Sequence, residues 1–162
     1  MTDAAPPADA LGALLRDEWR DPDGGAPIRL PPLAVAIERS LAGREADLVT
    51  PLGLGRRLAV VSDATTRVVL GARVERALAR VATIEPVVLN GQPHADASTV
   101  EWLRQACAHV DALVAVGSGT INDLCKYSSA LDGKPYAVFA TAPSMNGYTS
   151  LTASISQHGH KM

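Results

Sequence analysis

One stretch decides the fold of this chain: Val114-Ala115-Val116-Gly117-Ser118-Gly119-Thr120-Ile121-Asn122-Asp123-Leu124. A short apolar run ends in a glycine turn, and residues with helical spacing follow the turn. Glycines let the backbone approach a ligand closely, and the first amides of a helix have no intrahelical partner and lie at the positive end of its dipole. The stretch predicts a strand, a turn suited to a phosphate or pyrophosphate, and a helix that Thr120 and Asp123 cap as a pair.

Compact apolar runs and helical patterns alternate on both sides of this stretch. They predict strands over residues 58–61, 86–89, 112–116 and 136–141, and helices over 66–81, 98–110 and 120–131. Ser98 is expected to cap the second of these helices. Strands that are apolar throughout, and that alternate with helices, indicate a parallel sheet covered on both faces. The expected fold is α/β and Rossmann-like.

The order of the parts excludes the ordinary dinucleotide fold and the P-loop. In the ordinary fold the glycine loop follows the first strand, and an acidic residue comes about 20 residues later. Here Asp63 ends an early strand, and the glycine turn comes two strands afterwards. No Gly-Lys-Ser/Thr follows Gly117 at the interval that a P-loop needs.

Composition bounds the class of protein. The chain has 162 residues, 47% of them hydrophobic, and a formal net charge of −2, which suits one globular core. Residues 51–162 are expected to form that domain, and residues 1–50 a tail with a helical lead-in over 33–41. Without a basic stripe, a long apolar segment or a recognisable leader, we expect no nucleic-acid partner, no membrane and a cytoplasmic location. The cysteines, Cys107 and Cys125, are expected to be buried or half-buried thiols.

A second motif joins the first in a defined order. After the early Asp and the late Gly-Ser-Gly-Thr-Ile-Asn-Asp-x-x-Lys comes Ala140-Thr141-Ala142-Pro143-Ser144-Met145-Asn146-Gly147-Tyr148-Thr149-Ser150. From Arg57 onward, the chain resembles the bacterial branch of the sn-glycerol-1-phosphate dehydrogenase family. That family lies within the superfamily of iron-containing alcohol dehydrogenases, glycerol dehydrogenases and dehydroquinate synthase-like enzymes.

The resemblance implies an NAD(P)-dependent, metal-dependent dehydrogenase that interconverts sn-glycerol 1-phosphate and dihydroxyacetone phosphate in glycerophospholipid metabolism. Its partner would be a small phosphorylated polyol, and a homo-oligomer stays open. In relatives, a helical second domain holds a divalent metal (zinc, nickel or iron) with one Asp and two His beyond the matching region. The chain is therefore expected to be an N-terminal fragment without the helical metal-binding second domain, without catalytic residues or metal ligands, and inactive alone.

Within the first motif, the resemblance implies that the backbone holds the cofactor. Gly117, Ser118, Gly119 and Thr120 would present amides and a hydroxyl to the NAD pyrophosphate, whereas in isolation such a turn would be an ordinary strand-to-helix connection. Asp123 matches a cofactor contact of the family, although a helix cap needs the same residue type.

The remaining site residues follow from the resemblance in the same way. Asp63 would accept hydrogen bonds from the adenosine ribose, which favours NAD over NADP, or it would only cap the next helix. Thr141, Ser144 and Ser150 match the second cofactor segment. Asn146 stands near the substrate where many relatives have Asp, and an amide can both donate and accept hydrogen bonds.

Four other polar residues are not expected to take part in binding or catalysis. Lys126 could reach a phosphate but is expected to be solvated, and Tyr148 is expected to pack with its hydroxyl at the surface. His158 and His160 have strand spacing for a shared face, but without a third ligand they are not expected to bind a metal.

Two further classes of function stay open. A glycerol or polyol dehydrogenase, or a dehydroquinate synthase-like lyase, would use the same nucleotide fold, although Ala142-Pro143-Ser144-Met145-Asn146 argues against the lyase. A non-catalytic nucleotide-binding domain, complete as it stands, is the third option.

Overall fold

The computed structural model describes residues 12–13, 16, 18, 34–142, 147–157 and 160–161. The chain divides into two compact units, Met1–Ile37 and Glu38–Met162, and the second unit carries the sheet and the candidate site.

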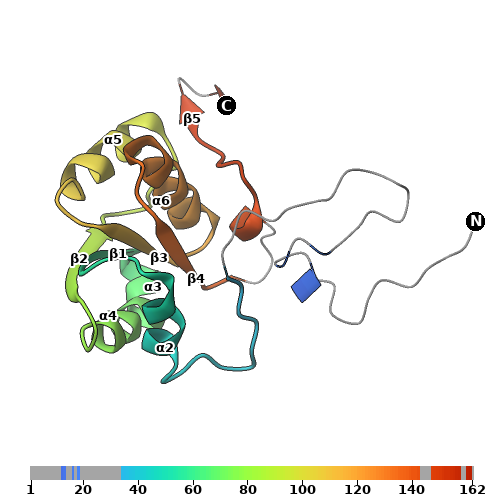
Figure 1. Cartoon of the computed structure of the whole chain (residues 1–162). Helices are drawn as coiled ribbons and strands as arrows, with labels where there is room; N and C mark the ends of the chain where they lie inside the picture. The colour runs from blue at the N-terminus through green and yellow to red at the C-terminus, as the bar shows by residue number, and fades with distance from the viewer. Residues whose placement is uncertain are drawn as a thin grey trace, which may run out of the picture. The chain divides into compact units, whose positions relative to one another are not determined.

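A four-stranded parallel sheet forms the centre of the second unit (Figure 1). Its strands are β1 (Arg57–Asp63), β2 (Thr83–Leu89), β3 (Ala112–Gly117) and β4 (Tyr136–Ala140), in the order β2-β1-β3-β4. Every residue of β3 is buried, as the unbroken apolar run predicts. Pro86 lies in β2 at the edge of the four-stranded sheet, and because the Thr83 amide donates toward the β1 side and backbone direction alternates along a strand, position 86 faces away from β1.

Helices follow the strands in the predicted alternation. They are α3 (Ala64–Thr66), the π-helical turn η2 (Arg67–Gly71) and α4 (Ala72–Leu78) after β1, α5 (Ala97–Ala106) after β2, and α6 (Gly119–Asp132) after β3. The single helix predicted over 66–81 is therefore interrupted by the π turn and ends at Leu78.

The expected Ser98 cap is wrong, because Asp96 takes that position. The Asp96 Oδ1 atom accepts a hydrogen bond from the Thr99 amide at 2.8 Å, so α5 begins directly after Asp96. The Ser98 hydroxyl lies inside the first turn and donates to the same Oδ1 atom at 2.8 Å.

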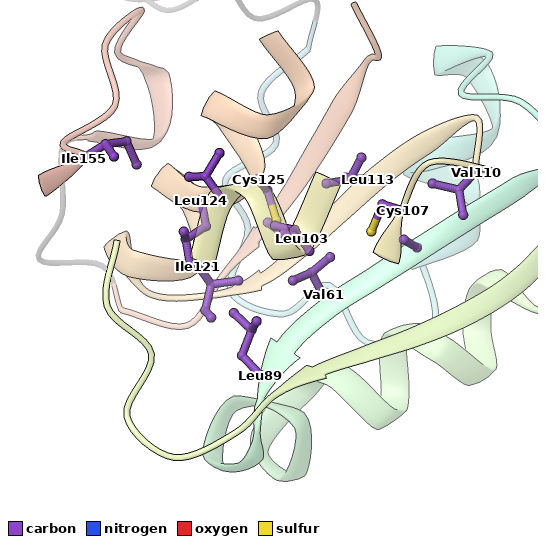
Figure 2. Packing of buried hydrophobic residues seen from close by; sticks show 13 residues of the cluster. Val61, Leu89, Leu103, Cys107, Val110, Leu113, Ile121, Leu124, Cys125 and Ile155 are labelled. Atoms are coloured by element: carbon purple, nitrogen blue, oxygen red, sulfur yellow. The ribbon is translucent and has the colours of Figure 1, made fainter. Parts of the chain in front are cut away.

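Two separate hydrophobic clusters show that helices cover both faces of the sheet. Leu58 and Val60 of β1 pack in one cluster with Val74 of α4, whereas Ala59 and Val61 belong to the other cluster. That second cluster joins the sheet to α5 and α6, and Figure 2 shows its side chains between these helices and the strands. The Rossmann-like three-layer fold is thus confirmed.

The lead-in differs from the prediction. Residues 34–40 form no helix, and the first regular elements of this unit are α2 (Glu45–Val49) and η1 (Thr50–Leu52). Gly43 adopts a left-handed conformation with φ of +85° just before α2, which separates α2 from the preceding chain. Ile37 of this stretch is 81% exposed, and a short apolar pattern that buries little surface is too weak to make a helix.

The chain ends in a segment that runs past α6. It comprises η3 (Gly147–Thr149) and then β5 (Ser156–Gln157), which pairs antiparallel with β6 (His160–Lys161). We call residues 147–156 the strap, shown in red in Figure 1. Among the described residues, no helix has the length and apolar character needed to cross a bilayer.

Candidate functional site

The candidate site lies at the carboxyl edge of the sheet, between two neighbouring strands. From β1 the chain moves outward to β2 and then returns past β1 to β3, so β1 and β3 feed helices on opposite faces. Open α/β sheets bind ligands in the crevice outside such a switch point. Val61 pairs with Ala115, and two residues further along both strands end, at Asp63 and Gly117.

At the end of β3, the turn has room only for glycine. A Cβ atom on Gly117 would lie 2.6 Å from Cγ1 of Ile121, which is closer than such atoms approach in real structures. The absence of a side chain therefore lets the first turn of α6 fold directly against the strand end.

The start of α6 leaves amides without a hydrogen-bond partner among the described residues. Ser118 is the N-cap residue, but its side chain makes no capping hydrogen bond, and the first intrahelical bond runs from the Asn122 amide to the Ser118 carbonyl at 3.0 Å. The amides of Gly119, Thr120 and Ile121 donate to no other described residue. Of these three residues Thr120 is half-buried, whereas Gly119 is buried and Ile121 is 0% exposed. The Thr120 amide is therefore the most accessible donor at the positive end of a fourteen-residue helix, a place that suits a pyrophosphate.

The predicted capping pair at this helix start is wrong. Because α6 begins at Gly119, Thr120 is its second residue and Asp123 lies beyond the first turn. Asp123 instead accepts hydrogen bonds from the Asn122 side-chain amide at 3.2 Å and from the Ser154 amide at 3.3 Å. Its carboxylate is therefore turned to the strap as well as to its own helix.

Asp63 forms a reciprocal cap at the start of α3. Its Oδ1 atom accepts from the Thr66 amide at 2.7 Å, and the Asp63 amide donates to Oγ1 of Thr66 at 3.1 Å. The capping alternative is confirmed, but it uses one carboxylate oxygen, and Oδ2 accepts from no other described residue. The second oxygen of Asp63 is thus free to accept from a ligand beside the turn.

Lys126 is not a solvated lysine, contrary to the sequence-based expectation. Its residue is only 7% exposed, and its Nζ atom donates to the carbonyls of Gly147, Ser150 and Thr152 at 2.6, 2.8 and 3.1 Å. The pKa of Lys126 is lowered from its usual value, because the effect of burial outweighs the opposite effect of the Asp123 carboxylate. Sequence spacing could have indicated this role, because Lys126 follows Asp123 by three residues on the same side of α6.

The second motif begins where β4 ends, beside the glycine turn. The Thr141 amide donates to the Gly117 carbonyl at 3.1 Å, and the Tyr148 hydroxyl lies 3.2 Å from the carbonyls of both Gly117 and Ala142. The expectation that the Tyr148 hydroxyl lies at the surface is wrong, since the residue is half-buried and its hydroxyl faces these two carbonyls. Burial raises the pKa of the phenol, which is protonated at neutral pH. Tyr148 therefore joins the strap to the turn.

The other residues predicted for the second motif divide into two groups. Ser150 is half-buried on the strap, and its Oγ atom lies 2.9 Å from Oγ1 of Thr152. Ser144 and Asn146 lie outside the described residues, so their expected contacts are untested.

A metal has no evident place in the described part of this chain. Among the described residues, no three His, Cys, Asp or Glu side chains lie close enough together to hold an ion. His160 lies in β6, whereas His158 lies outside the described residues.

Comparison with known proteins shows the family of this chain. Residues 36–162 match the family model described as iron-containing alcohol dehydrogenase, and this chain belongs to that family. It is 37% identical over 142 residues to a glycerol-1-phosphate dehydrogenase (NAD(P)+) of Geobacillus stearothermophilus, covering 78% of the chain and 34% of the relative.

Solved structures of dehydrogenases share the fold of this chain. A probable glycerol dehydrogenase from Sinorhizobium meliloti matches with a TM-score of 0.57 and 27% identity, over 72% of this chain and 32% of that one. A glycerol dehydrogenase from Schizosaccharomyces pombe shares the fold with a TM-score of 0.64 at 18% identity, over 75% of this chain and 31% of that one. The chain thus spans about a third of the length of these proteins.

Proposed function

We propose that this chain is the nucleotide-binding part of an NAD(P)-dependent, metal-dependent dehydrogenase that interconverts sn-glycerol 1-phosphate and dihydroxyacetone phosphate. The observation that carries the proposal is the row of free amides at Gly119, Thr120 and Ile121, next to Asp63 at the switch point of the sheet. The name of the Geobacillus relative supports the substrate and the nucleotide.

In this proposal the backbone binds the cofactor and the side chains orient it. The amides of α6 hold the pyrophosphate, with the Ser118 and Thr120 hydroxyls beside it, because both residues are half-buried at the turn. Oδ2 of Asp63 accepts from the adenosine ribose, while Oδ1 keeps its bond to Thr66. When bound, the nicotinamide supplies the hydride chemistry.

The remaining predicted residues would act on the far side of the turn. Thr141, Ser144 and Ser150 would line the nicotinamide half of the cofactor, and Asn146 would contact the substrate with its neutral amide. Asp123 would act from α6 by holding the strap at Ser154. A divalent metal belongs to the proposed activity, but the described residues offer no ligand set for it.

Nucleotide titration of the full chain tests this proposal. Following NADH or NADPH fluorescence, we expect saturable binding with the lower Kd for NADH, because the Asp63 carboxylate would repel a 2′-phosphate. Failure of both nucleotides to bind would refute the proposal.

Asp63→Ser separates the two roles of the aspartate. Serine is also a good N-cap, so α3 should keep its start and the melting temperature should change little. Removing the negative charge should shift the preference toward NADPH. An unchanged ratio of the two dissociation constants would limit Asp63 to its capping role.

The substrate alternative is an unphosphorylated polyol, because the similar Sinorhizobium structure is that of a probable glycerol dehydrogenase. Titration of the NAD-bound chain with glycerol and, separately, with sn-glycerol 1-phosphate would distinguish the two substrates, because the true substrate should have the lower Kd.

A further inference from the structure

The strap is anchored to the second unit at both of its ends. Its first turn, η3, is hydrogen bonded to the glycine turn through Tyr148. At its other end Ile155 is 1% exposed and packs in the core cluster shown in Figure 2. Next to it, the Ser156 amide donates to the Ala95 carbonyl at 2.7 Å. Between these anchors the strap has no regular secondary structure of its own.

Lys126 supplies the anchor in the middle. All hydrogen bonds of its ammonium group among the described residues go to strap carbonyls, those of Gly147, Ser150 and Thr152. Asp123, one turn earlier on α6, accepts from the strap amide of Ser154. Two oppositely charged side chains of one helix thus satisfy both kinds of backbone group on the strap.

Such a lysine has a specific effect on the segment it binds. An ammonium group removed from water is unfavourable unless hydrogen bonds replace its hydration, and here three carbonyls do so. A methionine would have a similar length and no desolvation penalty, but it would leave those carbonyls without their donor. Lys126 therefore constrains the path of the strap more than an apolar residue could.

The first part of the strap lies on the side of the turn where the nicotinamide half of a dinucleotide would extend, because Tyr148 is hydrogen bonded to Gly117 and to Ala142 just after β4. The end of the strap at Ser156 instead returns to Ala95, between β2 and α5. Along the sheet, β1, β3 and β4 are successive neighbours, ending at Asp63, Gly117 and Ala140. A dinucleotide with its adenosine ribose at Asp63 and its pyrophosphate at the turn would continue past β4 to the strap. Ser150 is on the strap, and its own carbonyl is held by Lys126.

We propose that Lys126 is a positioning residue for the nucleotide site, which holds the strap so that it accommodates the nicotinamide half of the cofactor. The proposal rests on the proposed function, because it assumes that a dinucleotide binds across the strand ends. Lys126 itself does not contact the cofactor, since its donors are used on the strap.

The test compares Lys126→Met with Lys134→Met in the full chain. Lys134 is the matched control, because its Nζ also donates to backbone carbonyls, those of Cys107 and Ala108 at 2.6 and 2.9 Å, at the far end of α5. NADH and ADP are the probes, since ADP carries the adenosine ribose and the pyrophosphate but no nicotinamide. Hydrogen exchange of the strap amides is measured without nucleotide.

We expect Lys126→Met to raise the Kd for NADH at least about fivefold and to leave the Kd for ADP within about twofold, since charged hydrogen bonds are lost only at the strap. Strap amides should exchange faster in this variant. Lys134→Met should change neither constant, even if it lowers the melting temperature. Lys126→Arg, which keeps the charge and donors in a different geometry, should recover part of the NADH affinity.

Three results would overturn the positioning role: unchanged NADH binding in Lys126→Met, an equal loss of NADH and ADP binding, or unchanged exchange of the strap. If the unmodified chain binds neither NADH nor ADP, it is the proposed function that fails, whatever the exchange of the strap shows. The exchange comparison distinguishes the two failures, because it reports whether Lys126 holds the strap when no nucleotide is present.

Discussion

At the scale of single residues, some positions of this chain accept only a small side chain, because a neighbouring residue fills the space beside them. Gly117 is the clearest case, because Ile121 fills the space that its Cβ would need. A lone glycine in a sequence is ambiguous, since it can serve a turn, a close approach or neither. The contact with Ile121 shows which of these applies here.

Gly117→Ala is expected to destabilise the chain by about 1–3 kcal/mol, because the added methyl group must displace Ile121 from the core. It should also weaken NADH binding, since α6 would shift from the turn. Chemical denaturation and NADH titration measure the two effects.

Gly71→Ala is the matched control. Gly71 has helical backbone angles, and its added Cβ would lie no closer than 3.4 Å to another atom, an ordinary contact. This variant should be neutral or slightly stabilising, because alanine favours the helix. Equal losses in both variants would contradict the steric argument.

The two buried thiols predict a stability change in alkali. Burial raises the pKa of Cys107 to about 11, and it also raises the pKa of Cys125. The unfolded chain therefore loses these protons at lower pH than the folded chain, so the contribution of the two thiols to stability is fully present below a pH of about 8.5 and is lost as the pH rises through the folded values. Denaturation between neutral and alkaline pH should show this fall.

The double variant Cys107→Ala/Cys125→Ala provides the comparison. It will be less stable at neutral pH because both side chains are in the core, but its stability should depend less on pH in the alkaline range. The same alkaline slope in both proteins would assign the effect to other groups.

At the scale of elements, the ends of helices depend on which of several polar residues caps them. Asp96 and Ser98 are both good N-cap residues, and the chain uses Asp96 because the Thr99 amide lies within reach of its carboxylate. Propensity alone does not distinguish two capping residues two positions apart, so the sequence places the N-cap of α5 at Ser98, two residues after the observed cap.

Asp96→Ala should lower the free energy of unfolding by about 1 kcal/mol, the usual effect of losing an N-cap. Ser98→Ala should have a much smaller effect, since its hydroxyl only supports the Asp96 carboxylate. Urea denaturation of the two variants decides between them. A larger loss for Ser98→Ala would restore the cap that the sequence predicted.

At the scale of the whole molecule, the site depends on the order of the strands. Asp63 and Gly117 are far apart in the sequence, and they become neighbours because β3 returns to lie beside β1. The apolar runs predict four parallel strands but not their order, since all four could pair in several ways. The family resemblance, which the comparisons confirm, was the only sequence-based reason to place these residues together.

The sequence by itself determined the succession of strands and helices, the two-sided core and the glycine turn, because apolar periodicity and backbone requirements act over a few neighbouring residues. Only the tertiary structure decided that Lys126 is buried against the strap and that Tyr148 reaches the glycine turn. It also decided that Asp63, at the end of β1, lies beside this turn. These contacts join segments distant in the chain, and whether a polar group is buried or solvated depends on what packs against it.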